Sequence, residues 1–90
     1  MNLNDLAKQC LEISKQRKDL DESTVLDYLK HCSGEVLEAV DAYIASDSKR
    51  DFELELADII ICVLLVCAKE DIDIEQALKD AMKKNRARIK

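Results

Sequence analysis

Two pairs of acidic side chains in this sequence have the residue types and the spacing of a metal site. Glu35 and Glu38 are three residues apart, and so are Glu55 and Asp58. On a helix, two residues at this spacing project to the same side. Two such helices packed antiparallel would bring the four carboxylates into one cleft, and oxygen ligands of this kind suit Mg²⁺. The spacing therefore favours a magnesium site built from both pairs.

Of the four acidic residues, Asp58 has the most apolar neighbours, so its negative charge most needs a partner. On a helix it falls beside Ile61 and Leu65 in the most apolar segment of the chain. An uncompensated buried carboxylate costs several kcal/mol, so a cation, a proton or a basic side chain must neutralise it. The competing interpretation is that Asp58 pairs with a lysine such as Lys69 or Lys84, and that the other three carboxylates are surface residues.

The end of the chain is strongly basic and offers candidate ligands for an anion. Lys84, Asn85 and Arg88 could form a clamp over a phosphate that the metal already holds. The competing interpretation is that basic residues in a last helical turn only complement the helix dipole. The sequence leaves both interpretations open.

Helices must hold these residues, because the composition excludes most other elements. The chain has 90 residues with one Gly and no Pro, so it lacks the turn residues of hairpins and β-sandwiches. Apolar periodicity predicts helices over about residues 3–17, 25–45 and 49–69. Candidate N-caps are Asn2 or Asn4 for the first helix and Ser23 or Thr24 for the second. A capping box at residues 73–76 opens a fourth helix. We therefore expect one all-α domain over residues 1–90, a small bundle of about four helices.

Size and charge limit the partners. A chain this short buries too little surface for a robust isolated core, so we expect homo-oligomerisation to complete the bundle. The formal net charge of −5 argues against a nucleic-acid polymer as the partner. The longest apolar run, residues 59–68, would span only about half a bilayer and is predicted to be core. The first residues lack a secretory signal, which predicts a cytoplasmic protein.

The four cysteines show no CxxC spacing and fall among apolar residues. We expect them to be reduced thiols that pack in the core. A zinc site needs imidazole and thiolate ligands together, and His31 with Cys62 is too small a set to predict one.

The acidic pairs occur in a recognisable order. The ExxE of Glu35 and Glu38 is followed, after sixteen residues, by the ExxD of Glu55 and Asp58. This pattern resembles the signature of the MazG-like family of all-α nucleoside triphosphate pyrophosphohydrolases. The resemblance covers about residues 26–89 and continues through residues 71–78 and the basic residues 84–88. Gly34 departs from it, because the family often has a further acid at that place.

The resemblance implies a Mg²⁺-dependent enzyme that cleaves an NTP or dNTP between its α and β phosphates, leaving a monophosphate and pyrophosphate. It implies Glu35, Glu38, Glu55 and Asp58 as metal ligands, with Glu38 favoured slightly over Glu35 as the base that takes a proton from water. It also implies that Lys84 and Arg88 bind the leaving pyrophosphate, that Asn85 bonds a sugar or phosphate, and that the protein is a homodimer or homotetramer.

Two other functions remain open. One is a phosphoribosyl-ATP pyrophosphohydrolase, although the ring-bearing residue expected soon after Asp58 is replaced by Ile61 and Cys62. The other is a non-catalytic helical module that binds partner helices or nucleotides, because an apolar third helix would serve a dimer interface equally well.

Overall fold

The computed structural model describes residues 2–17, 24–45 and 48–89, and these contain helices and turns but no strand. The helices are α1 (Leu3–Arg17), α2 (Val25–Ala45), α3 (Lys49–Lys69) and α4 (Ile74–Ala87). The all-α prediction and the three predicted helix ranges are confirmed. None of the helices in the described part of the chain is long and apolar enough to cross a membrane.

Side-chain caps fix where α1 and α2 begin. The Asn2 side-chain oxygen accepts a 2.8 Å hydrogen bond from the backbone N–H of Asp5. At α2, Thr24 Oγ1 accepts from the N–H of Asp27 at 3.2 Å, and the Asp27 carboxylate accepts from the N–H of Thr24 at 3.0 Å. These bonds satisfy N–H groups that have no partner within the helix. The other predicted cap of α2, Ser23, lies outside the described residues.

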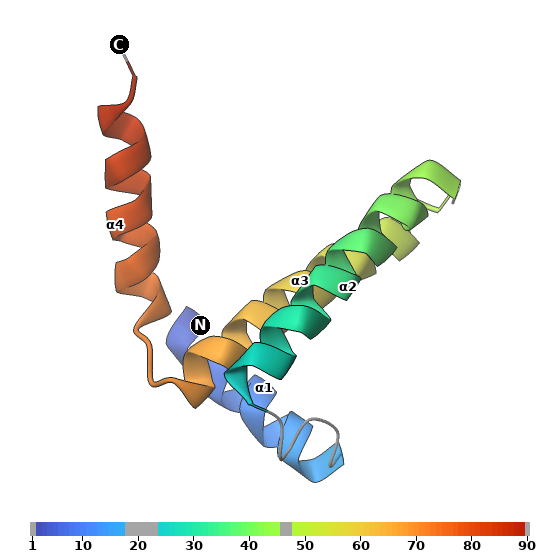
Figure 1. Cartoon of the computed structure of the whole chain (residues 1–90), viewed down its shortest axis with the longest axis horizontal. Coiled ribbons are helices and arrows are strands. Elements are labelled where there is room, and N and C mark those ends of the chain that lie inside the picture. The colour runs from blue at the N-terminus through green and yellow to red at the C-terminus, as the bar shows by residue number, and fades with distance from the viewer. Residues whose placement is uncertain (1, 18–23, 46–47, 90) are drawn as a thin grey trace.

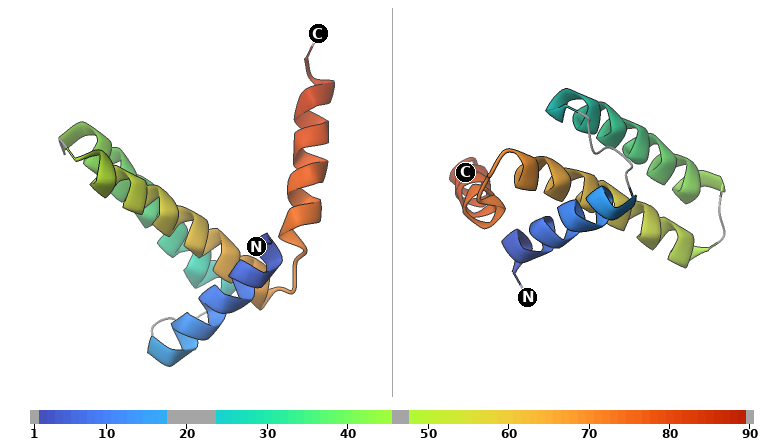
Figure 2. Two further views of the ribbon diagram at one scale, coloured as in Figure 1. Left: turned by 180° about the vertical axis from the view of Figure 1, so that it is seen from behind. Right: turned by 90° about the horizontal axis from the view of Figure 1, so that it is seen from below.

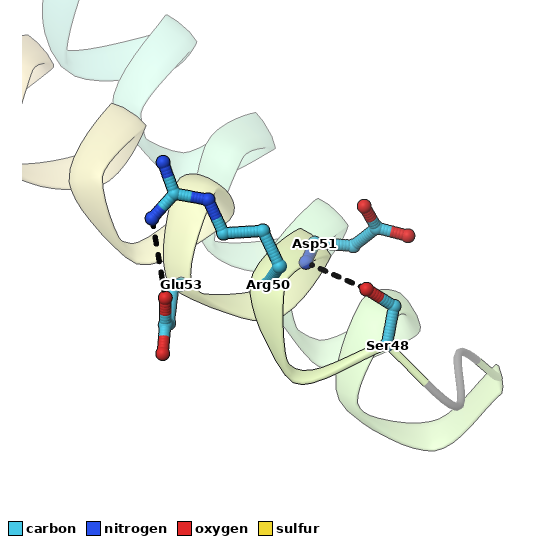
Figure 3. A network of polar contacts seen from close by, with 4 residues as sticks. All are labelled: Ser48, Arg50, Asp51 and Glu53. Atoms are coloured by element: carbon cyan, nitrogen blue, oxygen red, sulfur yellow. Dashed lines mark hydrogen bonds and ion pairs between the residues drawn. The ribbon is translucent and has the colours of Figure 1, made fainter.

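The start of α3 is capped in the same way (Figure 3). Ser48 Oγ accepts a 3.2 Å hydrogen bond from the backbone N–H of Asp51. Along the first turn, Arg50 forms a 3.3 Å ion pair with Glu53, and both side chains are well exposed. An exposed pair of this kind contributes little to stability. The cap therefore positions the start of the helix that carries Glu55 and Asp58.

Helix α3 is the centre of the packed part of the molecule. It lies antiparallel beside α2 and also packs on α1, as Figures 1 and 2 show. Tyr28 of α2 is the largest fully buried side chain, at 1% exposure. The buried apolar residues are Ala7, Tyr28, Ala39, Cys62, Leu64, Leu65 and Cys67. Four of these seven belong to α3, and all four lie in residues 59–68, the apolar run that is predicted to be core.

Helix α4 is attached to the rest of the molecule by its first turn. Asp73 caps it by accepting a 3.1 Å hydrogen bond from the N–H of Gln76, as the capping box predicts. The Asn4 side chain donates to Asp73 at 3.0 Å and accepts from the N–H of Ile74 at 3.0 Å. Asn4 thus joins the start of α1 to the start of α4.

Beyond this junction, α4 extends away from α2 and α3 (Figure 1). It has no buried residue. Leu78 and Met82 on α4 are exposed, as are Leu56, Ile60 and Val63 on α3. The prediction of about four helices is confirmed, and the prediction that a second copy completes the bundle stays a prediction. Within the described residues, three of the helices pack together and the fourth does not join them. The physical reason is that α4 is held only where it meets the start of α1.

The Asn4 junction can be tested by mutation. We expect Asn4→Ala to lower the free energy of unfolding by about 1 kcal/mol, because it leaves the N–H of Ile74 and the Asp73 carboxylate without this partner. Thermal unfolding with Gln9→Ala as control, an exposed residue on the same helix, measures the effect. Equal stabilities of the two variants would contradict this account of the junction.

Candidate metal centre

The antiparallel packing of α2 and α3 brings three of the four predicted metal ligands together. Glu35 of α2 and Glu55 and Asp58 of α3 each offer a carboxylate oxygen, and these oxygens lie within 4.8 Å of one another. Two of these residues come from one helix and the third from its neighbour. The helix pair therefore creates a cluster that neither helix could form alone.

Glu38, the fourth predicted ligand, lies close enough to act on this cluster but is not one of the three. Its negative charge raises the pKa of both Glu35 and Glu55, after the larger effect of burial. The Glu38 side chain is exposed. The four carboxylates therefore lie in one region of the molecule. Three of them have oxygens within 4.8 Å of one another, and Glu38 lies beside this cluster.

Glu35 and Glu55 each have one carboxylate oxygen that lacks a partner. The Glu35 side chain is only 13% exposed, and the Oε2 atoms of both residues are buried with no hydrogen-bond partner. Burial raises the pKa of each, and the charges of Glu38 and Asp58 raise it further. Buried oxygens are normally hydrogen-bonded, so two orphaned carboxylate oxygens facing like charges need an explanation. A cation bound between them would supply it.

Asp58 differs from the sequence-based expectation. It is exposed rather than buried, because its side of α3 lines an open cleft instead of packing against a helix. Within residues 2–17, 24–45 and 48–89 it forms no ion pair. Lys69, one proposed partner, lies with its Nζ 5.0 Å from the ring centroid of Tyr28. The need for neutralisation that the sequence assigned to Asp58 belongs to Glu35 and Glu55.

The cleft has a volume of about 590 Å³ and lies between α1, α2 and α3. Two acidic residues, Glu35 and Asp58, line it together with the basic residue Arg17 at the end of α1. The remaining lining residues are Cys10, Ile13, Ser14, His31, Ile61, Cys62 and Leu65. The cleft therefore combines anionic, cationic and apolar walls, as a site for a charged organic ligand does.

Sequence reasoning missed Arg17, and it weighed His31 only with Cys62, as a set too small to predict a zinc site. Arg17 lies in a charged stretch that reads as a connection, and only the crossing of α1 over α3 brings it to the cleft. His31 Nε2 lies 3.1 Å from Glu35 Oε1, one helical turn away. The i, i+4 spacing of these two residues was a signal that could have found this contact.

The predicted phosphate ligands are not part of this cluster within one chain. Lys84, Asn85 and Arg88 are exposed near the far end of α4. Helix α4 contacts α1 at its start and extends away from the acidic residues (Figure 1). Among the described residues, the charges that shift the pKa of Glu35 come from α2 and α3 and not from α4.

Comparison with known proteins gives a family. A sequence model of the MazG nucleotide pyrophosphohydrolase domain matches residues 20–90. The chain belongs to the MazG family. Neither a curated protein nor a solved structure matches it. The MazG match includes all four carboxylates and the basic end of the chain, but it begins after α1. Helix α1, which forms one wall of the cleft, therefore lies outside the family match.

The raised pKa of Glu55 predicts how stability depends on pH without metal. Because its pKa is raised, the Glu55 carboxyl group holds its proton more tightly in the folded state than in the unfolded state. In the unfolded state this pKa is near 4.5. The free energy of unfolding therefore falls as pH rises from 4.5 through the raised pKa. We expect Glu55→Gln to reduce this fall and to raise the thermal midpoint at pH 7 in a chelator.

The control for this experiment is Glu53→Gln, which changes an exposed acid two residues away on the same helix. Its thermal midpoint should follow that of the wild type across the same pH range. A Glu55→Gln variant that is less stable than the wild type at pH 7 in chelator would show that the carboxylate is compensated within the protein.

Proposed function

We propose that this MazG-family chain is a Mg²⁺-dependent nucleoside triphosphate pyrophosphohydrolase. It adds water across the anhydride between the α and β phosphates of an NTP or dNTP, releasing a nucleoside monophosphate and pyrophosphate. The observation that carries this proposal is the pair of buried, unpartnered oxygens on Glu35 and Glu55 beside Asp58. Uncompensated anionic oxygens at a cleft are the donor set that a hard cation needs.

The residues proposed for the Mg²⁺ site are Glu35, Glu38, Glu55 and Asp58, with Glu35, Glu55 and Asp58 as the clustered ligands and Glu38 at the edge of the cluster. The fit rests on donor chemistry, because all four ligands are carboxylates and Mg²⁺ prefers oxygen. Bound there, Mg²⁺ would offset the negative charge of the triphosphate and of the four carboxylates. Without the cation, the carboxylates would repel the negatively charged phosphates of the substrate. They would therefore hold those phosphates near the cleft only through the bound cation.

Glu38 is the proposed general base. It is exposed and stands beside the three clustered carboxylates, whereas the Glu35 side chain is only 13% exposed and lies among them. A carboxylate outside the clustered group is freer to accept a proton from the attacking water. We therefore favour Glu38 over Glu35, and the proton moves from that water to a Glu38 carboxylate oxygen as the new bond to the α phosphorus forms.

The cleft supports a nucleotide of ordinary size. Its volume of about 590 Å³ falls within the range of roughly 300–1,000 Å³ for small-molecule sites. The Arg17 guanidinium can contact a phosphate, and Ile13, Ile61 and Leu65 give the apolar surface that a base or sugar needs. Because α1 supplies Arg17 and Ile13, we assign part of the substrate selection to the helix outside the family match.

Lys84, Asn85 and Arg88 are proposed to bind the pyrophosphate of a site on a second copy of the chain. Their helix extends away from the acidic cluster of its own chain, so a partner is needed to bring both sets together. The exposed apolar residues of α3 and α4 supply surface for such a homodimer or homotetramer. A second copy would thus complete both the hydrophobic packing and the site.

The activity is tested by pyrophosphate release from a panel of standard and modified NTPs and dNTPs, with phosphoribosyl-ATP included. We expect Mg²⁺-dependent turnover that Asp58→Asn lowers by roughly a hundredfold or more, because it removes a negative charge from the metal site. Asp41→Asn, an exposed acid on α2, is the control and should keep full activity. Absence of Mg²⁺-dependent pyrophosphate release across the panel would refute the proposal.

The sharing of a site between two copies is tested by mixing two impaired variants. Asp58→Asn damages the acidic cluster and Arg88→Ala damages the basic end of α4. A mixed dimer has one site with both parts intact, so a fully exchanged equal mixture should recover about a quarter of wild-type activity. If the mixture shows only the average of the two variants, each site is built from a single chain.

A further inference from the structure

A second group of metal-binding side chains shares Glu35 with the acidic cluster. His31, Glu35 and Cys62 each offer one ligand atom, and these atoms lie within 4.8 Å of one another. Unlike the all-carboxylate cluster, this group combines an imidazole, a carboxylate and a thiol. The two groups therefore differ in the class of metal they would bind.

The geometry of the group comes from one turn of α2 and the facing side of α3. His31 and Glu35 are four residues apart, and His31 Nε2 lies 3.1 Å from Glu35 Oε1. The imidazole is 49% exposed, whereas the Glu35 side chain is 13% exposed and its Oε2 has no hydrogen-bond partner. Cys62 closes the group from α3 and is only 4% exposed. An ion can thus enter from the His31 side and reach two buried donors.

The donor types select the ion. Thiolate and imidazole ligands favour Zn²⁺ and similar borderline metals, whereas Mg²⁺ favours oxygen. Three protein ligands with one further open position are typical of zinc sites that keep access to solvent. Cys32 adds an outer neighbour, because it lies close enough to the Cys62 thiol to raise its pKa. Such outer partners orient the ligands of metal sites.

We propose that His31, Glu35 and Cys62 form a binding site for a thiophilic divalent cation, with Zn²⁺ as the favoured ion, and that this site competes with Mg²⁺ for Glu35. The competition has two physical causes. Glu35 has a single carboxylate with one negative charge, so it cannot serve as a full ligand in both sites at once. In addition, two divalent cations held close together repel each other. Zn²⁺ is therefore an inhibitor of the Mg²⁺-dependent reaction, a consequence that rests on the proposed function.

Binding exchanges a proton for the metal at Cys62. In the metal-free protein the thiol keeps its proton, because burial, the neighbouring Cys32 and the nearby carboxylates raise the pKa of Cys62 to about 12. When the bond from Sγ to the cation forms, the thiol proton leaves to solvent, and neither sulfur nor metal changes oxidation state. The cation stabilises the thiolate that the apoprotein does not.

Cobalt binding tests the site without reference to catalysis. Co²⁺ has similar ligand preferences to Zn²⁺, and its bond to a thiolate gives a charge-transfer absorption in the near ultraviolet. With the full chain and a phosphine reductant, we expect this absorption to saturate at one Co²⁺ per chain. We expect Cys62→Ala to abolish it and Cys67→Ala, which changes a thiol of equal burial, to keep it.

His31→Ala is the second variant, because His31 is half exposed and its loss should leave the fold intact. We expect it to weaken Co²⁺ binding more than about tenfold, as loss of a ligand does. Absence of the absorption in the wild type, or its persistence in Cys62→Ala, would overturn the proposal. So would Co²⁺ binding that His31→Ala leaves unchanged.

Inhibition is measured on the same variants. Zn²⁺ should lower Mg²⁺-dependent pyrophosphate release by the wild type and by Cys67→Ala, and more than about tenfold higher Zn²⁺ should be needed for Cys62→Ala. Equal inhibition of all three would overturn the competition for Glu35. If the wild type released no pyrophosphate, the proposed function would fail, whereas the cobalt absorption would still decide whether the site exists.

Discussion

The structure depends on how it tolerates four negative charges where α2 meets α3. Glu35 and Glu55 each keep one carboxylate oxygen buried without a partner, with Asp58 and Glu38 close by. Burial and like charge both work against the ionised forms, and both raise the pKa of these two residues. The apoprotein therefore carries an electrostatic cost at the helix pair that forms most of its core. A divalent cation would remove that cost, so the proposed metal binding would be coupled to the packing of α2 on α3.

The rest of the fold gives this helix pair its setting. Helix α1 crosses α3 and forms one wall of the cleft. The hydrogen bonds of Asn4 hold the start of α4 against the start of α1. Helix α4 then leads its basic residues away from the acids, and apolar side chains of α3 and α4 stay exposed. A small core combined with an uncovered apolar surface is what a subunit of an oligomer has. The proposed second copy of the chain would explain both the placement of α4 and the incomplete packing.

Sequence reasoning succeeded where local rules decide the outcome. Helix ranges followed from periodicity and caps, and the convergence of Glu35 with Glu55 and Asp58 followed from equal spacing on adjacent antiparallel helices. It failed where tertiary placement decides. Asp58 lies at an open cleft despite its apolar neighbours, and the direction in which α4 leaves its junction with α1 follows from no local rule. The approach of His31 to Cys62 depends on the register of α2 against α3, which spacing along the chain does not contain.

The central claim is that the acidic cluster holds the metal on which the reaction depends. The most direct measurement is a crystal structure with Mn²⁺ in place of Mg²⁺, because anomalous scattering locates that ion unambiguously. The account predicts a manganese peak bound by oxygens of Glu35, Glu55 and Asp58, at the orphaned carboxylates between α2 and α3. A fully occupied manganese site elsewhere, with these carboxylates still unpartnered, would contradict it.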